Sequence, residues 1–181
     1  MDSTSSASLA RATGTEAALE LRSALDRIRH CTDQLTDDQI WERPAPGLNS
    51  IGNLLLHLGG NLRQWIVNGL TGAADFRDRP AEFAANGSIS KAELLANLND
   101  IVSQACATLE EQTAESLLTP RRIQGFDVNA LHAIFHSVPH FRGHAQEIIH
   151  MTRFLLGDGY RFAWKPATAE QGAPADPAGT A

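Results

Sequence analysis

Residues 128–156 read VNALHAIFHSVPHFRGHAQEIIHMTRFLL, and this stretch decides the fold. Its apolar residues recur at steps of three and four, which predicts a long amphipathic helix. The face centred on Phe141 gathers the residues Ile134, Val138, Ala145, Ile148, Thr152 and Leu155. Gly157 and Gly159 follow the last apolar residue and indicate where the helix ends. We therefore expect one long helix that buries its Phe141 face.

Three further segments show the same helical periodicity, at about residues 15–35, 50–70 and 90–109. Residues that break helices, such as Pro44, Pro46 and Pro120, fall between them. We find no period-two alternation of useful length, so we expect no strand. Four helices joined by short and medium loops predict an all-α fold, an antiparallel up-down-up-down four-helix bundle.

The composition limits where the protein works and what it binds. The formal charge of −6 and the lack of a basic cluster argue against nucleic acid. The apolar runs are too short to span a membrane, so we expect a soluble, cytoplasmic protein that does not bind membranes. Residues 1–14 and 166–181 lack apolar periodicity and are predicted to be mobile, on either side of one domain at 15–165. Cys31 and Cys106 are expected to be reduced thiols inside helices.

The last helix carries a ladder of histidines at four-residue spacing: His132, His136, His140 and His144. Each step of four turns the side chain by about 40°, so the rings do not all face one way. Measured from Phe141, His144 lies at about 60° and His140 at about 100°, and the other two lie further round. His140 and His144 are therefore the pair nearest the core.

The 50–70 segment places His57 at the margin of its own core face, about 100° from Leu58. An i,i+4 histidine pair and a third histidine from another helix suit a divalent metal ion, because imidazole nitrogens are good ligands for such ions. Three ligands leave a coordination position open, which is typical of a catalytic site. On spacing alone the alternative stays open that these histidines are hydrogen-bonded packing residues.

Two motifs resemble those of the DinB/YfiT-like superfamily, bacterial four-helix bundles in which three histidines bind a divalent metal. They are NSIGNLLLHLGGN at 49–61 and HFRGHAQEII at 140–149. A third run, Arg77-Asp78-Arg79 with Glu82-Phe83, resembles a loop signature of one uncharacterised branch. The resemblance covers about residues 19–164 and implies a bundle fold.

The resemblance implies that His57, His140 and His144 are the ligands. In many relatives Arg-Gly directly follows the last ligand, and by that register Arg142-Gly143 favours His136 and His140 instead. We prefer the later pair because it lies closer to the apolar face, with His136 as the first substitute. One divalent ion per chain is expected, zinc or nickel, although imidazole also suits iron and copper.

Members of the superfamily that this chain resembles include thiol-dependent S-transferases and maleylpyruvate isomerases, and others are labelled hydrolases by analogy. The resemblance therefore implies a metal-dependent enzyme that activates a low-molecular-weight thiol or water for a small-molecule substrate. The alternative is a non-catalytic metal-binding or stress-related interaction bundle, a homodimer formed through exposed helix faces.

Residues that act on the substrate are less well indicated. No catalytic residue is assigned, although Glu147 and Glu42 are candidates for a general base. Asn61 is a candidate for orienting the substrate, or is simply a solvent-bonded amide. Arg77, Arg79 and Glu82 are candidates for lining the mouth of the site and clamping an anionic group, or belong to a solvated, salt-bridged loop.

Overall fold

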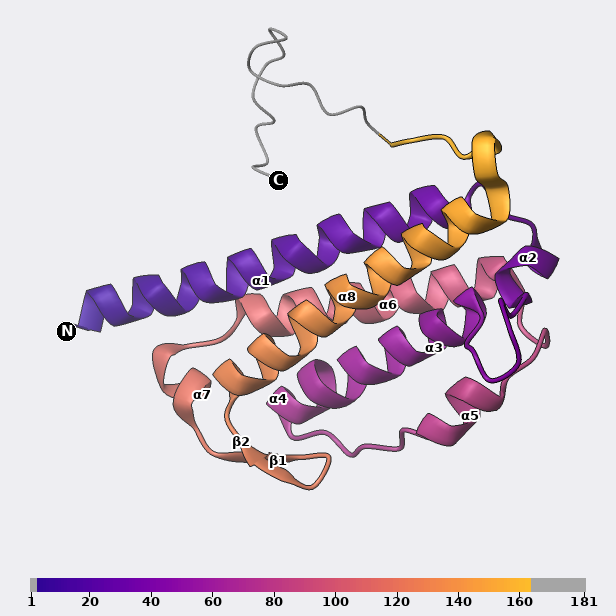
Figure 1. Ribbon diagram of the computed structural model, residues 1–181. Coiled ribbons are helices and arrows are strands. Elements are labelled where there is room, and N and C mark those ends of the chain that lie inside the picture. Colours follow the sequence, from indigo (N-terminus) through magenta and orange to yellow (C-terminus); the bar gives the residue numbers. More distant parts are fainter. Residues whose placement is uncertain (1–2, 164–181) are drawn as a thin grey trace, which may run out of the picture.

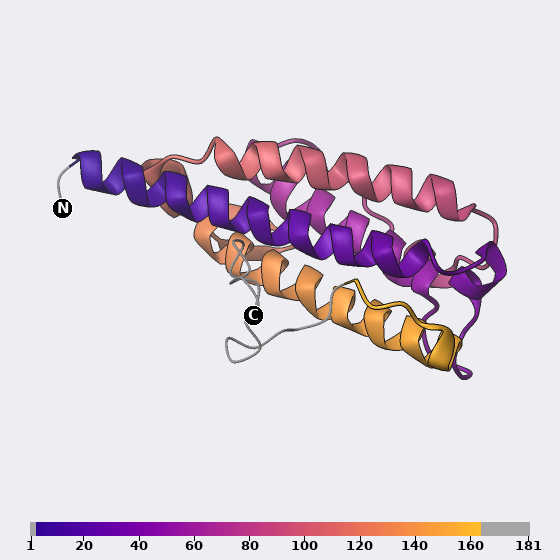
Figure 2. The same ribbon diagram turned by 90° about the horizontal axis from the view of Figure 1, so that it is seen from above.

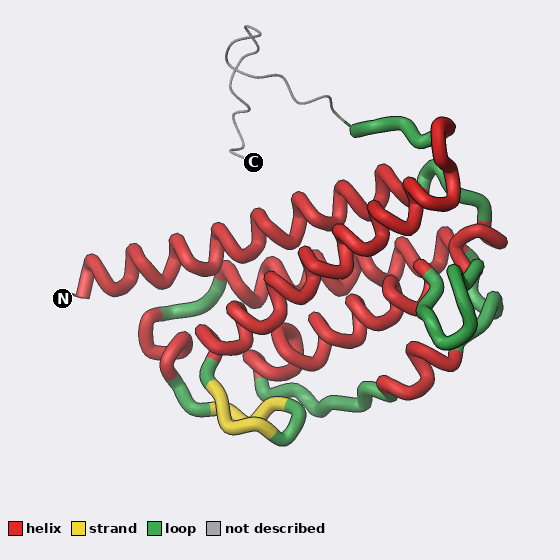
Figure 3. Tube along the Cα trace, viewed as in Figure 1, coloured by secondary structure: helices red, strands yellow, loops and turns green. Residues whose placement is uncertain are grey.

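A computed structural model describes residues 3–163, and most of them are helical (Figures 1 and 3). Four long segments lie side by side (Figures 1 and 2): α1 (Ser3–Thr32), α3 (Ile51–Leu62), α6 (Lys91–Glu110) and α8 (Ala130–Leu156). The α3 segment continues through a π-helix, η1 (Arg63–Asn68), into α4 (Gly69–Thr71). The connections hold α2 (Asp37–Trp41), α5 (Arg79–Ala84) and α7 (Ala114–Leu118), and α8 ends in the 3₁₀ turn η2 (Gly157–Gly159). The predicted helical class is confirmed. None of the described helices is both long and apolar enough to cross a membrane.

The directions of the four long segments differ from the prediction. Figure 1 shows α1 and α8 running in one direction and α3 and α6 in the other. The starts of α3 and α6 share one end of the molecule, where Trp41 Nε1 donates to the Ile89 carbonyl at 2.9 Å. The order is therefore up-down-down-up rather than up-down-up-down. Residues 72–90 make this possible because they return along the length of the bundle instead of turning tightly.

Helix α1 begins at Ser3, which corrects the prediction of a mobile segment over residues 1–14. The first turns of this helix are rich in small residues, so they show little apolar periodicity. They pack by close approach instead: a Cβ added to Gly14 would lie 2.1 Å from the carbonyl oxygen of Leu109 on α6. The second predicted mobile segment, 166–181, lies outside the described residues.

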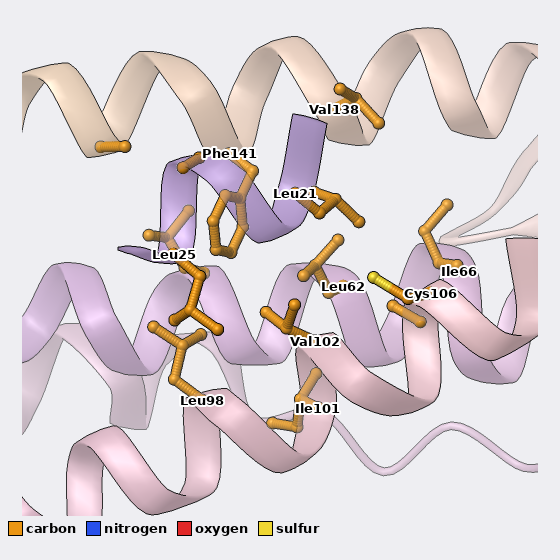
Figure 4. Close-up of a cluster of buried hydrophobic side chains, with 14 of the residues drawn as sticks. Leu21, Leu25, Leu62, Ile66, Leu98, Ile101, Val102, Cys106, Val138 and Phe141 are labelled. Atoms are coloured by element: carbon orange, nitrogen blue, oxygen red, sulfur yellow. The ribbon is translucent and has the colours of Figure 1, made fainter. Parts of the chain in front are cut away.

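The core runs between the four long segments, and Phe141 sits in it with an exposure of 1% (Figure 4). Leu21 of α1, Leu62 of α3 and Val102 of α6 are drawn around it from the other three segments. The predicted Phe141 face of α8 is confirmed, since most of its members are buried. The side chains that flank this core on α3 and α8 form the site described below.

A short hairpin precedes α8 and was not predicted. Strand β1 (Arg121–Ile123) pairs antiparallel with β2 (Phe126–Val128), with Ile123 opposite Phe126. The turn between them places Gln124 and Gly125 at φ of 52° and 85°, the two positive values that a tight hairpin turn requires. Three-residue strands are too short to show an alternating pattern, so periodicity could not reveal them.

Candidate metal centre

Three histidines meet between α3 and α8. His57 on α3 faces His140 and His144, which lie one turn apart on the antiparallel helix α8. The ring centroid of His57 lies 5.0 Å from that of His140 and 5.3 Å from that of His144, and the last two lie 4.6 Å apart. One nitrogen from each ring lies within 4.8 Å of the other two. His57 is buried, whereas the His144 side chain is 26% exposed, so the cluster is reached from the His144 side.

Two carboxylates fix the orientation of two of these rings. His57 Nδ1 lies 3.0 Å from Glu82 Oε2, and His144 Nδ1 lies 2.7 Å from Glu147 Oε2. An ionised carboxylate only accepts hydrogen bonds, so the tautomer that satisfies both contacts carries its proton on Nδ1. Arg77 Nη2 also lies 3.1 Å from His57 Nδ1, and in this tautomer it donates to Glu82 Oε2 instead. Each Nε2 is then left with a free lone pair. This carboxylate–histidine arrangement is the usual support of a metal-binding imidazole.

The spacing of the donor atoms fits a divalent ion. Two nitrogens bound tetrahedrally to zinc at about 2.0–2.1 Å lie about 3.3 Å from each other. The Nε2 atoms of His57 and His140 are 3.1 Å apart. His140 Nδ1 is buried and has no hydrogen-bond partner within the described part of the chain. Two converging Nε2 atoms beside a poorly satisfied ring are the pattern expected of ligands rather than of packing residues.

Burial, with a smaller contribution from the neighbouring His144 and His57, lowers the pKa of His140 to about 4. Removing an imidazole from water disfavours its charged form, and adjacent rings that can also become cationic add repulsion. His140 is therefore neutral near pH 7, the state in which its nitrogen can bind a metal.

Glu82 reaches His57 because several features of the sequence hold its helix against α3. Asp78 caps α5 by accepting from Ala81 N at 3.1 Å. Asn53 Nδ2 then fastens that helix to α3 by donating to the Glu82 carbonyl at 2.9 Å. Gly60 leaves room for the Glu82 carboxylate, since a Cβ there would lie 2.0 Å from Oε1. The second glycine of the 49–61 motif, Gly60, thus makes space for the carboxylate that orients His57.

Arg77 completes this network. Its guanidinium is already bonded within the protein, so it is not available to clamp an anionic group, the role predicted for it. Its Nε donates to Glu82 Oε1 at 2.7 Å and its Nη2 to Oε2 at 2.9 Å, while Nη1 donates to Gln64 Oε1 at 2.9 Å. The Arg77 side chain is only 5% exposed. Burial raises the pKa of Glu82, but the bonds from Arg77 and His57 outweigh it and hold that pKa below its usual value. Arg77 therefore keeps Glu82 ionised as an acceptor for His57.

The remaining predicted residues lie at different distances from the cluster. Asn61 is 5% exposed, and its Oδ1 is buried without a partner among the described residues. Arg79 is exposed and stacks over the Phe83 ring at 4.8 Å. His136 lies outside the cluster and stacks on Trp65, with ring centroids 4.0 Å apart. The structure thus brings His144, not His136, together with His57 and His140. Of the two predicted base candidates, Glu42 is exposed.

The sequence named Glu82 only as a candidate for the mouth of the site or as part of a solvated loop, and its contact with His57 was not predicted. Its separation of 25 residues from His57 offers no local periodicity to reveal the contact. The only available signal was the motif Arg77-Asp78-Arg79 with Glu82-Phe83, read there as a loop signature.

Replacing Glu82 by Gln is expected to weaken metal binding about tenfold, the lower end of what loss of a ligand's supporting acceptor costs. The amide removes the charge that stabilises a proton on His57 Nδ1. Glu147→Gln is the matched control, and its effect should be smaller because Glu147 is 46% exposed and more screened. Competition with a chromogenic chelator measures both affinities. Equal losses in the two variants would show that Glu82 has no special role.

Comparison with known proteins places this geometry in context. The family model described as "Protein of unknown function (DUF1572)" matches residues 12–167. A conserved protein from Enterococcus faecalis has a similar structure, with a TM-score of 0.67 and 18% identity over 78% of this chain and 95% of that one. A DinB-like protein from Bacillus cereus gives a TM-score of 0.58 and 18% identity over 75% of this chain and 85% of that one. No curated protein matches the sequence. At these identities the two structures establish the fold alone.

Proposed function

We propose that this chain, which belongs to the DUF1572 family of proteins of unknown function and is DinB-like, is a metal-dependent thiol S-transferase. The observation that carries the proposal is the donor set. His57, His140 and His144 converge from two helices, and Glu82 and Glu147 orient two of them. Three protein ligands leave room for a small molecule to complete the coordination.

The histidines are neutral donors, so they do not cancel the charge of the ion they hold. A divalent ion on them would act as a Lewis acid and lower the pKa of a thiol bound to it, which keeps the sulfur as a nucleophilic thiolate. Zinc and nickel are the ions we propose, because both accept imidazole ligands. The thiol enters from the His144 side, where the cluster is exposed.

Thiol transfer is favoured over hydrolysis by the state of the nearby carboxylates. A thiol starts from a pKa of about 8.5 and water from about 15.7, so the same ion would ionise a bound thiol more completely, and the proton could pass to solvent without a protein base. Both carboxylates that contact the three histidines in the described structure already accept from a ring nitrogen, and Glu82 is also held by Arg77. Neither is free to act as a base. Asn61 offers an unpartnered, buried Oδ1, and we propose that it orients the thiol or the electrophile.

Cobalt substitution gives a test that does not depend on turnover. We expect a low-molecular-weight thiol such as cysteine to produce a sulfur-to-cobalt charge-transfer band in the cobalt-loaded protein, and none in His140→Ala. The zinc-loaded protein should also accelerate the reaction of that thiol with a fluorogenic electrophile, monochlorobimane, and a chelator should remove this acceleration.

The other outcomes separate the alternatives. If the protein hydrolyses activated esters with its metal but gives no sulfur-to-cobalt charge-transfer band, the proposed transferase is wrong and the protein is a hydrolase. Stable metal binding with neither activity would favour the non-catalytic interaction bundle, whose proposed homodimer is checked by light scattering.

A further inference from the structure

A second polar cavity lies at the opposite end of the α3 segment from its N-terminus. It has a volume of about 310 Å³ and is enclosed by η1, α4, the loop that follows and strand β1. That size is at the lower end of the range for small-molecule sites in proteins. Its polar lining includes Gln64, Asn68, Asp75, Arg121, Arg122 and Gln124. It contains none of the three clustered histidines.

Arg121 is the unusual member of this lining. Its Nε is buried and has no hydrogen-bond partner within residues 3–163, although the residue as a whole is only half-buried. An arginine cannot lose its proton in a protein, so the charge stays. A buried N–H of a charged group without an acceptor is uncommon in native structures and calls for a partner. Arg122 is different, since it pairs with Asp127 at 2.8 Å on the exposed side of the hairpin.

The acidic residue in the cavity lining, Asp75, already accepts hydrogen bonds from other residues. Asp75 Oδ2 accepts from Gln64 Nε2 at 2.5 Å, and Oδ1 accepts from the Arg77 backbone N–H at 3.1 Å. These bonds tie Asp75 to the network beside His57 and leave Arg121 without a counter-charge. The Asp75 charge repels a dianion such as phosphate more strongly than a monoanion in the same space.

The cavity is built by close backbone packing. A Cβ on Gly69 would lie 2.7 Å from Ile123 Cδ1, so the glycine lets β1 approach the α4 turn. Gly72 then reverses the chain at a φ of 80°. Arg121 is thereby held on a paired strand against the wall of the cavity rather than on a free loop.

We propose that this cavity binds a small organic carboxylate through the Arg121 guanidinium, with the amides of the lining as further hydrogen-bond donors. The planar fork of arginine matches two carboxylate oxygens. Gln64 borders the cavity and accepts from Arg77, so a hydrogen bond connects this site to the surroundings of His57. The proposal does not depend on the metal centre or on thiol transfer.

Isothermal titration of the full-length chain with acetate, succinate, phosphate and chloride at constant ionic strength tests this site. We expect saturable binding of at least one carboxylate, weakened tenfold or more in Arg121→Gln and unchanged in the control Arg63→Gln, which removes an exposed arginine outside the cavity lining. Arg121→Lys keeps the charge without the fork and should bind measurably more weakly than wild type, which guards against a fold defect in the glutamine variant.

His140→Ala separates this site from the metal centre, because carboxylates also coordinate metals. Binding that persists in His140→Ala supports the cavity, and binding that disappears there assigns the carboxylate to the metal centre and overturns the proposal. Three other results would also overturn the proposal: no saturable binding of any carboxylate, equal affinity for phosphate, or the same loss of binding in both arginine-to-glutamine variants.

Discussion

Alanine in place of His140 is expected to abolish metal binding. The wild-type chain should purify or reconstitute with about one ion, and the variant should retain less than about a tenth of that, because a site of three nitrogens becomes one of two. Loss of a supporting residue alone costs 10- to 100-fold in affinity, so loss of a ligand costs more than about 100-fold. Metal content by mass spectrometry on tag-free protein measures the effect.

His136→Ala is the matched control for this variant. It lies one turn before His140 on the same helix but stacks on Trp65 outside the cluster, so its metal content should equal that of the wild type. His57→Ala and His144→Ala should behave like His140→Ala. Loss of metal from the His136 variant with retention in the His144 variant would shift the site one turn along α8 and contradict the geometry described here.

Thermal stability distinguishes a ligand from a packing residue. A bound ion stabilises the native state by mass action, so a chelator should lower the Tm of the wild type and leave that of His140→Ala unchanged. Without metal, the variant should lose little stability, since it also removes the unpartnered Nδ1 of a partly buried ring. A packing histidine would give the reverse pattern, with no chelator effect and a clear destabilisation by alanine.

The positions of the three histidines could be predicted because a helix converts spacing into direction. Counting from Phe141 and Leu58 placed His57, His140 and His144 at the margins of two buried faces, and the structure brings these three together. What the count could not establish was that the two faces oppose each other. That step came from the resemblance to a known family, and it depends on the long-range packing of α3 against α8.

The parts that the sequence did not predict depend on contacts between distant segments. The direction of α6 depends on how far the 72–90 connection travels, and connection length alone does not determine this. The carboxylate of Glu82 reaches His57 only after α5 has docked on α3. The N-terminal turns of α1 pack through Gly14 and small neighbours, which carry no hydrophobic signal. Periodicity reports which side of an element is apolar, and not which element covers it.

Replacing Gly60 by Ala is expected to disturb the metal centre without changing any group that contacts the ion. The new methyl group would lie 2.0 Å from Glu82 Oε1 and 2.9 Å from Arg77 Nε, so the buried ion pair must move. Overpacking of this kind costs about 1–3 kcal/mol of stability. Because Glu82 then leaves His57, metal affinity should also fall, by up to about 100-fold. Chemical denaturation and chelator competition measure the two effects.

Gly143→Ala is the matched control, since Gly143 is also a helical glycine and lies between the two ligands of α8. A Cβ there meets nothing within 4 Å, and the residue is exposed. Removing glycine from a helix interior gains about 0.5–1 kcal/mol, so this variant should be as stable as the wild type or more so, with unchanged metal affinity. If both variants lost metal equally, the effect would come from the loss of backbone flexibility at a glycine and not from contact with Glu82. A loss confined to Gly60→Ala would show that Glu82 must sit against α3 for His57 to bind the ion.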